Sequence, residues 1–263
     1  MSVTSARADD PGNYVSFGDS LAANPNMVQI IAGHNPALAG VFKTPPIPEG
    51  YSATGEYNLA NRVAHDTGSS VHNYACSGAP GVLPHPFNFQ SQVDHAERDH
   101  SLTSDTQLVT IIFGMNDTYQ EPDVTKTPEQ REATFLQGMS TQVARVHSLA
   151  PNAKVIVVGY PDLTDGQSNL CPINFAANVS RVHVDGLDQT QETVRESQRK
   201  IAEDNGAIFL DISASINAQS NNNTCGTGER LAAADIDEQI HNLWGHLTTA
   251  ENQYYADRIK EIL

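Results

Sequence analysis

Short apolar runs recur along the chain at intervals that suit alternating strands and helices. The run over residues 107–113 is nearly continuous and β-branched, and four more short runs are rich in β-branched or aromatic residues. This pattern is typical of strands buried on both faces of a parallel sheet. The five predicted strands cover residues 14–17, 71–75, 107–113, 153–161 and 207–211.

Between the strands, apolar residues recur three and four positions apart, which predicts amphipathic helices. The clearest start is at Thr127, a capping residue followed by Pro128 and Glu129. The predicted helices cover residues 57–67, 87–98, 128–146, 187–204 and 248–263. By contrast, residues 24–55 are interrupted by prolines and glycines and are predicted to form a long functional loop.

The alternation of strands and helices predicts an α/β domain whose parallel sheet is covered on both faces. Its 263 residues contain no internal repeat and no linker that divides the chain. We therefore expect a flexible segment over residues 1–12 and one domain over residues 13–263.

The charge of the chain narrows the set of partners. A net charge of −16 argues against nucleic-acid binding, which needs a basic surface. It also argues against docking on anionic lipid by charge alone. No apolar run is long enough for a transmembrane helix, and we expect a monomer that acts on a small partner.

The three cysteines help to predict the cellular compartment of the protein. Cys171 and Cys225 both lie in polar, loop-like surroundings, whereas Cys76 follows a predicted strand. We predict a Cys171–Cys225 disulfide with Cys76 as a small buried side chain, the alternative being three unrelated thiols in a cytosolic protein. A bridge suits an oxidising compartment, and residues 6–8 (Ala-Arg-Ala) resemble a signal-peptidase site. Secretion or attachment to the cell envelope is the expected location.

Polar groups follow three of the predicted strands. Ser20 comes after the first strand, Gly78 after the second and Asn116 after the third. In a doubly wound sheet these strand ends lie at one edge, where ligands bind. A serine nucleophile needs a base within hydrogen-bond reach and donors for the oxyanion. The N–H groups of Ser20 and Gly78 and the amide of Asn116 are candidate donors.

Four segments in order resemble the motif blocks of the SGNH, or GDSL, hydrolases. They are Gly18-Asp19-Ser20-Leu21, Gly78, Gly114-Met115-Asn116-Asp117 and His246, and the resemblance spans essentially the whole chain. Residues 73–79 and 159–161 look most like secreted actinobacterial esterases and lipases of that family.

This resemblance implies a flavodoxin-like, three-layer α/β/α sandwich with five parallel strands. It also implies Ser20 as nucleophile, His246 as general base, and an oxyanion hole formed by Gly78, Asn116 and the Ser20 amide. No metal or organic cofactor is implied.

The histidine block departs from the family pattern, Asp-x-x-His-Pro. Leu243 stands at the acid position and Leu247 at the proline position. His241 is a rival for the base, on the requirement of geometric reach. The orienting group is open between a main-chain carbonyl near Leu243 and a carboxylate on the preceding loop. The carboxylate candidates are Asp235, Asp237 and Glu238.

The expected activity is hydrolysis of a carboxylic ester, of the esterase or lipase type, through an acyl-serine intermediate. The substrate is a small-molecule, lipid or glycan ester. Acyl transfer to an alcohol and removal of acetyl groups from carbohydrate are alternatives at the same site. Binding without catalysis is a third alternative, prompted by the missing acid at position 243.

Overall fold

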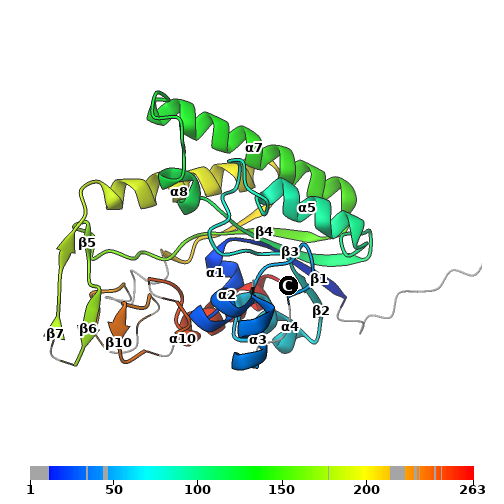
Figure 1. Ribbon diagram of the computed structural model, residues 1–263. Coiled ribbons are helices and arrows are strands. Elements are labelled where there is room, and N and C mark those ends of the chain that lie inside the picture. The colour runs from blue at the N-terminus through cyan, green and yellow to red at the C-terminus, as the bar shows by residue number, and fades with distance from the viewer. Residues whose placement is uncertain are drawn as a thin grey trace, which may run out of the picture.

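The computed structural model describes residues 12–33, 35–43, 47–176, 178–213, 223–227, 230, 232–239, 241–243 and 245–263. Within these ranges, a five-stranded parallel sheet lies between two layers of helices (Figure 1). Its strands are β1 (Asn13–Gly18), β2 (Ser70–Asn73), β3 (Thr106–Ile112), β4 (Lys154–Val158) and β9 (Ile208–Leu210). The strand order β2-β1-β3-β4-β9 is that of flavodoxin-like sheets and confirms the predicted fold class.

Each face of the sheet carries its own hydrophobic core. Because successive strand residues point to opposite faces, Tyr14 and Val15 belong to different cores. The Tyr14 core lies under α1 (Ser20–Ala23), α4 (Leu59–Thr67) and α10 (Thr249–Ile262). The Val15 core lies under α5 (Phe89–Arg98), α7 (Pro128–Leu149) and α8 (Leu187–Asp204). The two helical layers are seen below and above the sheet in Figure 1.

The long helices follow the sequence predictions closely. Helix α8 has the predicted bounds, and α7 begins at Pro128 after a capping box in which Thr127 and Gln130 bond each other's backbone. The apolar face of α5 contains Phe89, Val93 and Ala96, which are all buried. Spacings of three and four therefore located these helices correctly.

Residues 24–55 are not the continuous loop that their composition predicts. They contain α2 (Met27–Gly33) and α3 (Pro36–Phe42). The side chain of Asn35 caps α3 by accepting from the N–H groups of Ala37 and Leu38, and Pro36 occupies the first turn, where a missing N–H costs nothing. Local capping thus outweighs the proline and glycine content.

Two small sheets, which the apolar pattern does not predict, project from one end of the main sheet (Figure 1). One pairs β10 (Ile236–Asp237), β6 (Ile173–Phe175) and β7 (Asn178–Val179), and the other pairs β5 (Asn169–Leu170) with β8 (Val182–His183). Strands of two or three residues are too short to show a period. Residues 1–11 lie outside the described residues, so the assigned domain boundaries stay a prediction. Within the described ranges, no helix is both long and apolar enough to cross a bilayer.

Candidate active site

Ser20 lies at the carboxyl end of β1, as the first residue of α1. Asp19 caps this helix, because its carboxylate accepts from the Leu21 N–H at 2.9 Å. Gly18 does not have a positive φ, so a left-handed backbone conformation is not the reason for a glycine here. A Cβ at this position would lie 2.9 Å from the Ile112 carbonyl oxygen and 2.7 Å from the Ala22 Cβ. Gly18 therefore permits close packing of α1 and β3 beside the serine.

His246 lies against Ser20, with its Nε2 atom 2.7 Å from the serine Oγ. The histidine loop is held by backbone bonds, since the Ala233 N–H donates to the His246 carbonyl at 2.9 Å and Gly245 N–H donates to the Ala233 carbonyl at 3.1 Å. The rival His241 instead pairs its backbone with Thr248. The structure thus brings together the two residues, 226 positions apart, that a serine-histidine mechanism requires.

The carboxylates on the preceding loop are differently placed. Asp235 and Glu238 are exposed, and Glu238 lies 3.5 Å from Arg230. The side chain of Asp237 lies outside the described residues. Leu243, at the family's acid position, is a buried apolar residue.

Gly78 and Asn116 both lie near the end of β1. Gly78 has a φ of +79°, a conformation that favours glycine, and a Cβ there would meet nothing within 4 Å. The Gly78 carbonyl accepts from the Gln120 side chain at 3.0 Å. Among the hydrogen bonds of the described ranges, none is donated by the Ser20 or Gly78 N–H. Both N–H groups are therefore available to a ligand.

The amide of Asn116 is engaged within the protein. Its Nδ2 atom donates to the Ala79 carbonyl at 3.0 Å and to the Asp19 carboxylate at 3.3 Å. Its Oδ1 atom accepts from Gln120 at 3.2 Å and from the Tyr119 hydroxyl. These bonds orient Nδ2 toward the loop that carries Gly78, so donation to an oxyanion requires sharing one of its two N–H groups.

Two carboxylates lie beside these residues, Asp19, which is buried, and Asp117, which is partly buried. Burial raises the pKa of Asp19 to about 7, although Tyr160 and Leu21 donate to it. Burial also raises the pKa of Asp117, whose carboxylate accepts from the Gly81 and Val82 N–H groups at 2.7 and 2.9 Å. Both residues therefore organise local backbone.

Sequence reasoning missed several residues that hold the site together. Gln92 on α5 accepts from the Gly18 N–H at 2.9 Å and donates to the Gly18 carbonyl at 2.8 Å. The hydroxyl of Tyr160 donates to Asp19, and Gln120 fixes the Gly78 carbonyl. One signal existed: Gln92 lies on the buried face of α5, where an amide needs a partner. Nothing comparable marks Gln120, and Tyr160 lies in a segment that resembles secreted family members but carries no predicted role.

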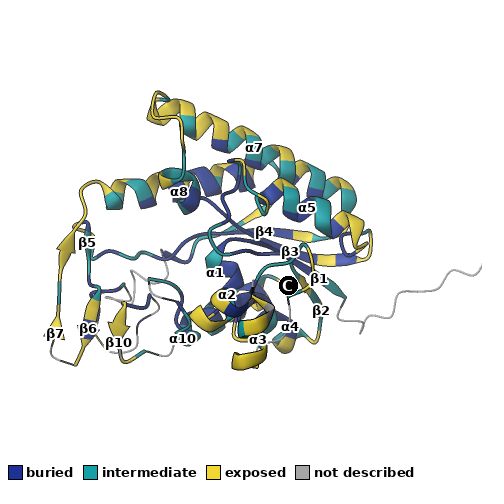
Figure 2. Ribbon diagram, viewed as in Figure 1, coloured by how far each residue is buried: buried dark blue, intermediate teal, exposed yellow. Residues whose placement is uncertain are grey.

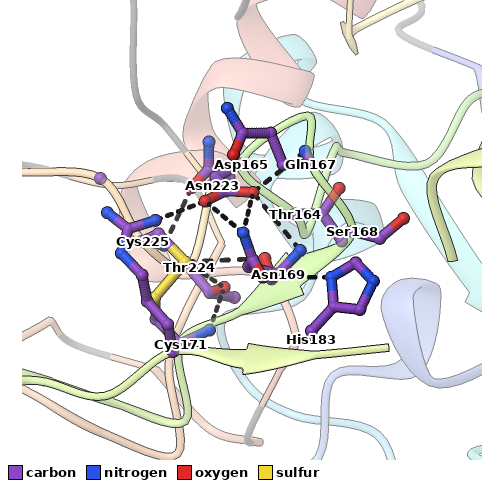
Figure 3. A network of polar contacts seen from close by, with 12 residues as sticks. Thr164, Asp165, Gln167, Ser168, Asn169, Cys171, His183, Asn223, Thr224 and Cys225 are labelled. Carbon is purple, nitrogen blue, oxygen red and sulfur yellow. Dashed lines mark hydrogen bonds and ion pairs between the residues drawn. A yellow bond between two sulfur atoms is a disulfide. The ribbon is translucent and has the colours of Figure 1, made fainter. Parts of the chain in front are cut away.

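The predicted Cys171–Cys225 disulfide is present, and Cys76 is a buried free thiol. Figure 3 shows the polar network around the disulfide, in which the Thr224 hydroxyl accepts from the Cys171 N–H at 3.0 Å. The same hydroxyl donates to the Leu163 carbonyl at 2.7 Å. Asn174 donates to the Thr224 carbonyl at 2.8 Å and accepts from the buried Arg230.

Arg230 links the disulfide region to the histidine loop. Its guanidinium donates to the carbonyls of Gly226 at 3.3 Å and Asn174 at 3.1 Å. Its own carbonyl accepts from the hydroxyl of Thr248, the residue that caps α10 two positions after His246. The disulfide-bearing loop is thereby joined to the segment that presents the histidine.

Two cavities lie on either side of Gln189 on α8. One, of about 580 Å³, is lined by several carboxylates, including Asp162 and Asp188. The other, of about 360 Å³, reaches Gly114 and Asp117, which flank Asn116. Neither is lined by Ser20 or His246, so we assign neither as the catalytic pocket. No group of three metal-ligating side chains is found in the part of the chain that the structure describes.

A serine and a histidine at hydrogen-bond distance, at the carboxyl edge of a flavodoxin-like sheet, define a hydrolase of the GDSL class. The chain belongs to the GDSL-like lipase/acylhydrolase family, whose model matches residues 16–250. This confirms the resemblance that the four sequence blocks carry.

Three solved structures illustrate the shared fold. Phospholipase A1 from Streptomyces albidoflavus NA297 is 19% identical, with a TM-score of 0.60 over 95% of this chain and 98% of that one. The extracellular lipase from Streptomyces rimosus is 17% identical, with a TM-score of 0.56 over 96% of this chain and 100% of that one. A family two carbohydrate esterase from Clostridium thermocellum is 12% identical, with a TM-score of 0.52 over 95% of this chain and 62% of that one. No curated protein matches the chain.

Proposed function

We propose that this hydrolase cleaves carboxylic esters through an acyl-serine intermediate. The observation that carries the proposal is the 2.7 Å separation of Ser20 Oγ and His246 Nε2. At this distance the imidazole can accept the serine proton as the oxygen attacks the ester carbonyl.

In the first half-reaction, Ser20 Oγ bonds to the carbonyl carbon and His246 Nε2 takes its proton. The oxyanion accepts hydrogen bonds from the N–H groups of Ser20 and Gly78, and the Asn116 amide shares one N–H. When the tetrahedral intermediate collapses, the alcohol leaves with the proton from His246. In the second half-reaction, water attacks the acyl group, His246 takes its proton, and Ser20 regains that proton as the acid departs.

The fold and the disulfide also support a location outside the cytosol. A disulfide persists in oxidising compartments, and one solved relative of the same fold is described as extracellular. We infer that the substrate is a lipid-type ester, since two relatives are described as a phospholipase A1 and a lipase. A carbohydrate ester is the second candidate, because of the carbohydrate esterase neighbour.

Two measurements test the ester hydrolase proposal. The Ser20→Ala variant should lose turnover of a soluble p-nitrophenyl ester, while its folded circular dichroism spectrum is retained. A serine-reactive phosphonate should label Ser20 alone in the wild-type protein. Unchanged turnover in Ser20→Ala, or labelling at another residue, would reject the assignment. Product analysis with an added acceptor alcohol separates hydrolysis from acyl transfer.

A further inference from the structure

The segment that contains α2 and α3 is closed at its base, beside the catalytic pair. The Gly55 N–H donates to the Ala23 carbonyl at 2.7 Å, and the Asn242 side chain donates to the Asn24 carbonyl at 2.7 Å. A Cβ on Gly55 would lie only 1.9 Å from the Asn24 oxygen, so this closure needs glycine. Asn24 follows the serine helix, and Asn242 lies four residues before His246. Both ends of the segment are thus fixed against the elements that carry Ser20 and His246.

Away from this base, α2 and α3 pack against each other and expose apolar side chains to solvent. Figure 2 shows the exposed surface on both helices, close to α1. The exposed residues are Met27, Val28, Ile31, Val41 and Phe42, and Val41 retains 73% of its accessible surface. A group of apolar residues at this density on a helical hairpin is typical of an interaction surface.

The chemistry of the hairpin indicates its partner. Residues 27–42 contain no Asp, Glu, Lys or Arg, although the chain as a whole has 31 acidic and 15 basic residues. An anionic membrane would require basic residues here, and the net charge of −16 would oppose it. An uncharged lipid surface needs only apolar contact, because amphipathic helices lie at such an interface with their apolar side chains inserted.

We propose that the α2–α3 hairpin docks on the surface of an uncharged lipid aggregate and places Ser20 next to that surface. The inference rests on the proposed ester hydrolase function and specifies its substrate as an aggregated lipid ester. The hairpin is joined to the Ser20 helix at one end and to the histidine loop through Asn242. Docking therefore brings the substrate phase to the edge of the sheet where the nucleophile lies.

The test uses vesicle cosedimentation of full-length Ser20→Ala, which binds lipid without consuming it. This protein should cosediment with phosphatidylcholine vesicles, and added phosphatidylglycerol should not strengthen binding. The further substitutions Val41→Ser and Phe42→Ser should together weaken the partition coefficient by about tenfold. Ile31→Ser alone should weaken it in the same direction and serves as a second, milder variant.

The matched control is Val124→Ser with Phe175→Ser. Val124 and Phe175 are 84% and 49% exposed, against 73% and 51% for Val41 and Phe42, but they lie outside the hairpin. In the Ser20→Ala background, this control variant should bind vesicles as strongly as Ser20→Ala itself. With Ser20 intact, both double variants should hydrolyse a soluble short-chain ester at the wild-type rate, which shows that they fold.

Three results would overturn the docking inference. The first is that full-length Ser20→Ala does not bind vesicles, and the second is that the hairpin and control substitutions weaken vesicle binding equally. The third is a dimer in solution that the hairpin substitutions dissociate. The last result would assign the surface to a second copy of the chain. Failure of the ester hydrolase proposal is distinguishable, because it would appear as no turnover of the soluble ester whatever the vesicle result.

Discussion

The carboxylate of Asp19 accepts a hydrogen bond from the Asn116 amide at 3.3 Å. The same amide donates to the Ala79 carbonyl, next to Gly78, and Tyr160 donates to Asp19 from the end of β4. One buried carboxylate therefore joins the loops that follow β1, β2, β3 and β4. These bonds fix the Asn116 amide, one of the candidate oxyanion donors, relative to the loops that carry Ser20 and Gly78.

Asp19 is expected to make stability depend on pH. Its pKa is about 7 in the folded protein, against 3.8 for an unperturbed aspartate, so the folded state binds more protons between these pH values. The free energy of unfolding contributed by Asp19 therefore falls as pH rises from about 4 to 7, by up to about 4 kcal/mol, and is constant above 7. Urea unfolding at several pH values in this range measures the difference in the free energy of unfolding between the wild type and Asp19→Asn. A constant difference would contradict the raised pKa.

Glu251 provides an independent test of a buried carboxyl. It is fully buried on α10, neither carboxyl oxygen has a hydrogen-bond partner within the described ranges, and burial raises its pKa well above the usual value. Folding above pH 4.5, the usual glutamate pKa, must then take up a proton, so the stability of Glu251→Gln relative to the wild type should increase as pH rises above that value. The exposed Glu203→Gln is the control for unfolding experiments, and an equal pH slope in both variants would refute the expectation.

Sequence periodicity predicted the main sheet and the long helices because burial imposes a clear pattern on them. It failed for α3, where Asn35 and Pro36 supply a local start signal inside a proline-rich stretch. It also failed for β5 and β8, whose two-residue strands have no measurable period.

The candidate site also contains residues that the sequence predicted and residues that it did not. Ser20, Gly78, Asn116 and His246 lie in motif blocks, and the structure places Ser20 and His246 in contact. The supporting residues Gln92 and Arg230 were not predicted, because their partners are backbone atoms far away in sequence. A side chain that bonds distant backbone leaves little trace in a single sequence, whereas a motif is visible locally.

The disulfide is expected to stabilise both the fold and the histidine loop. Cys171 and Cys225 are separated by 54 residues, so replacing both with serine should lower the free energy of unfolding by about 4 kcal/mol on the chain-entropy account. The contacts through Arg230 to Thr248 predict that turnover of a soluble ester falls as well. Reduction of the wild type by dithiothreitol should reproduce both effects, whereas Cys76→Ala should remain sensitive to the reductant. If neither the double serine replacement nor dithiothreitol changed the free energy of unfolding, a structural role of the disulfide would be excluded.

The orientation of His246 is the remaining chemical question, and we expect a serine–histidine dyad oriented by a main-chain carbonyl near Leu243. Leu243 is buried and apolar where the family has an acid, while Asp235 and Glu238 are exposed. Asp235→Asn, Asp237→Asn and Glu238→Gln should therefore each retain kcat for a soluble ester within about threefold. His246→Gln should lose about a thousandfold or more, because it removes the base. A loss of that size in one of the three acid variants would identify that carboxylate as the orienting group and contradict the dyad, provided that its unfolding curve matches the wild type.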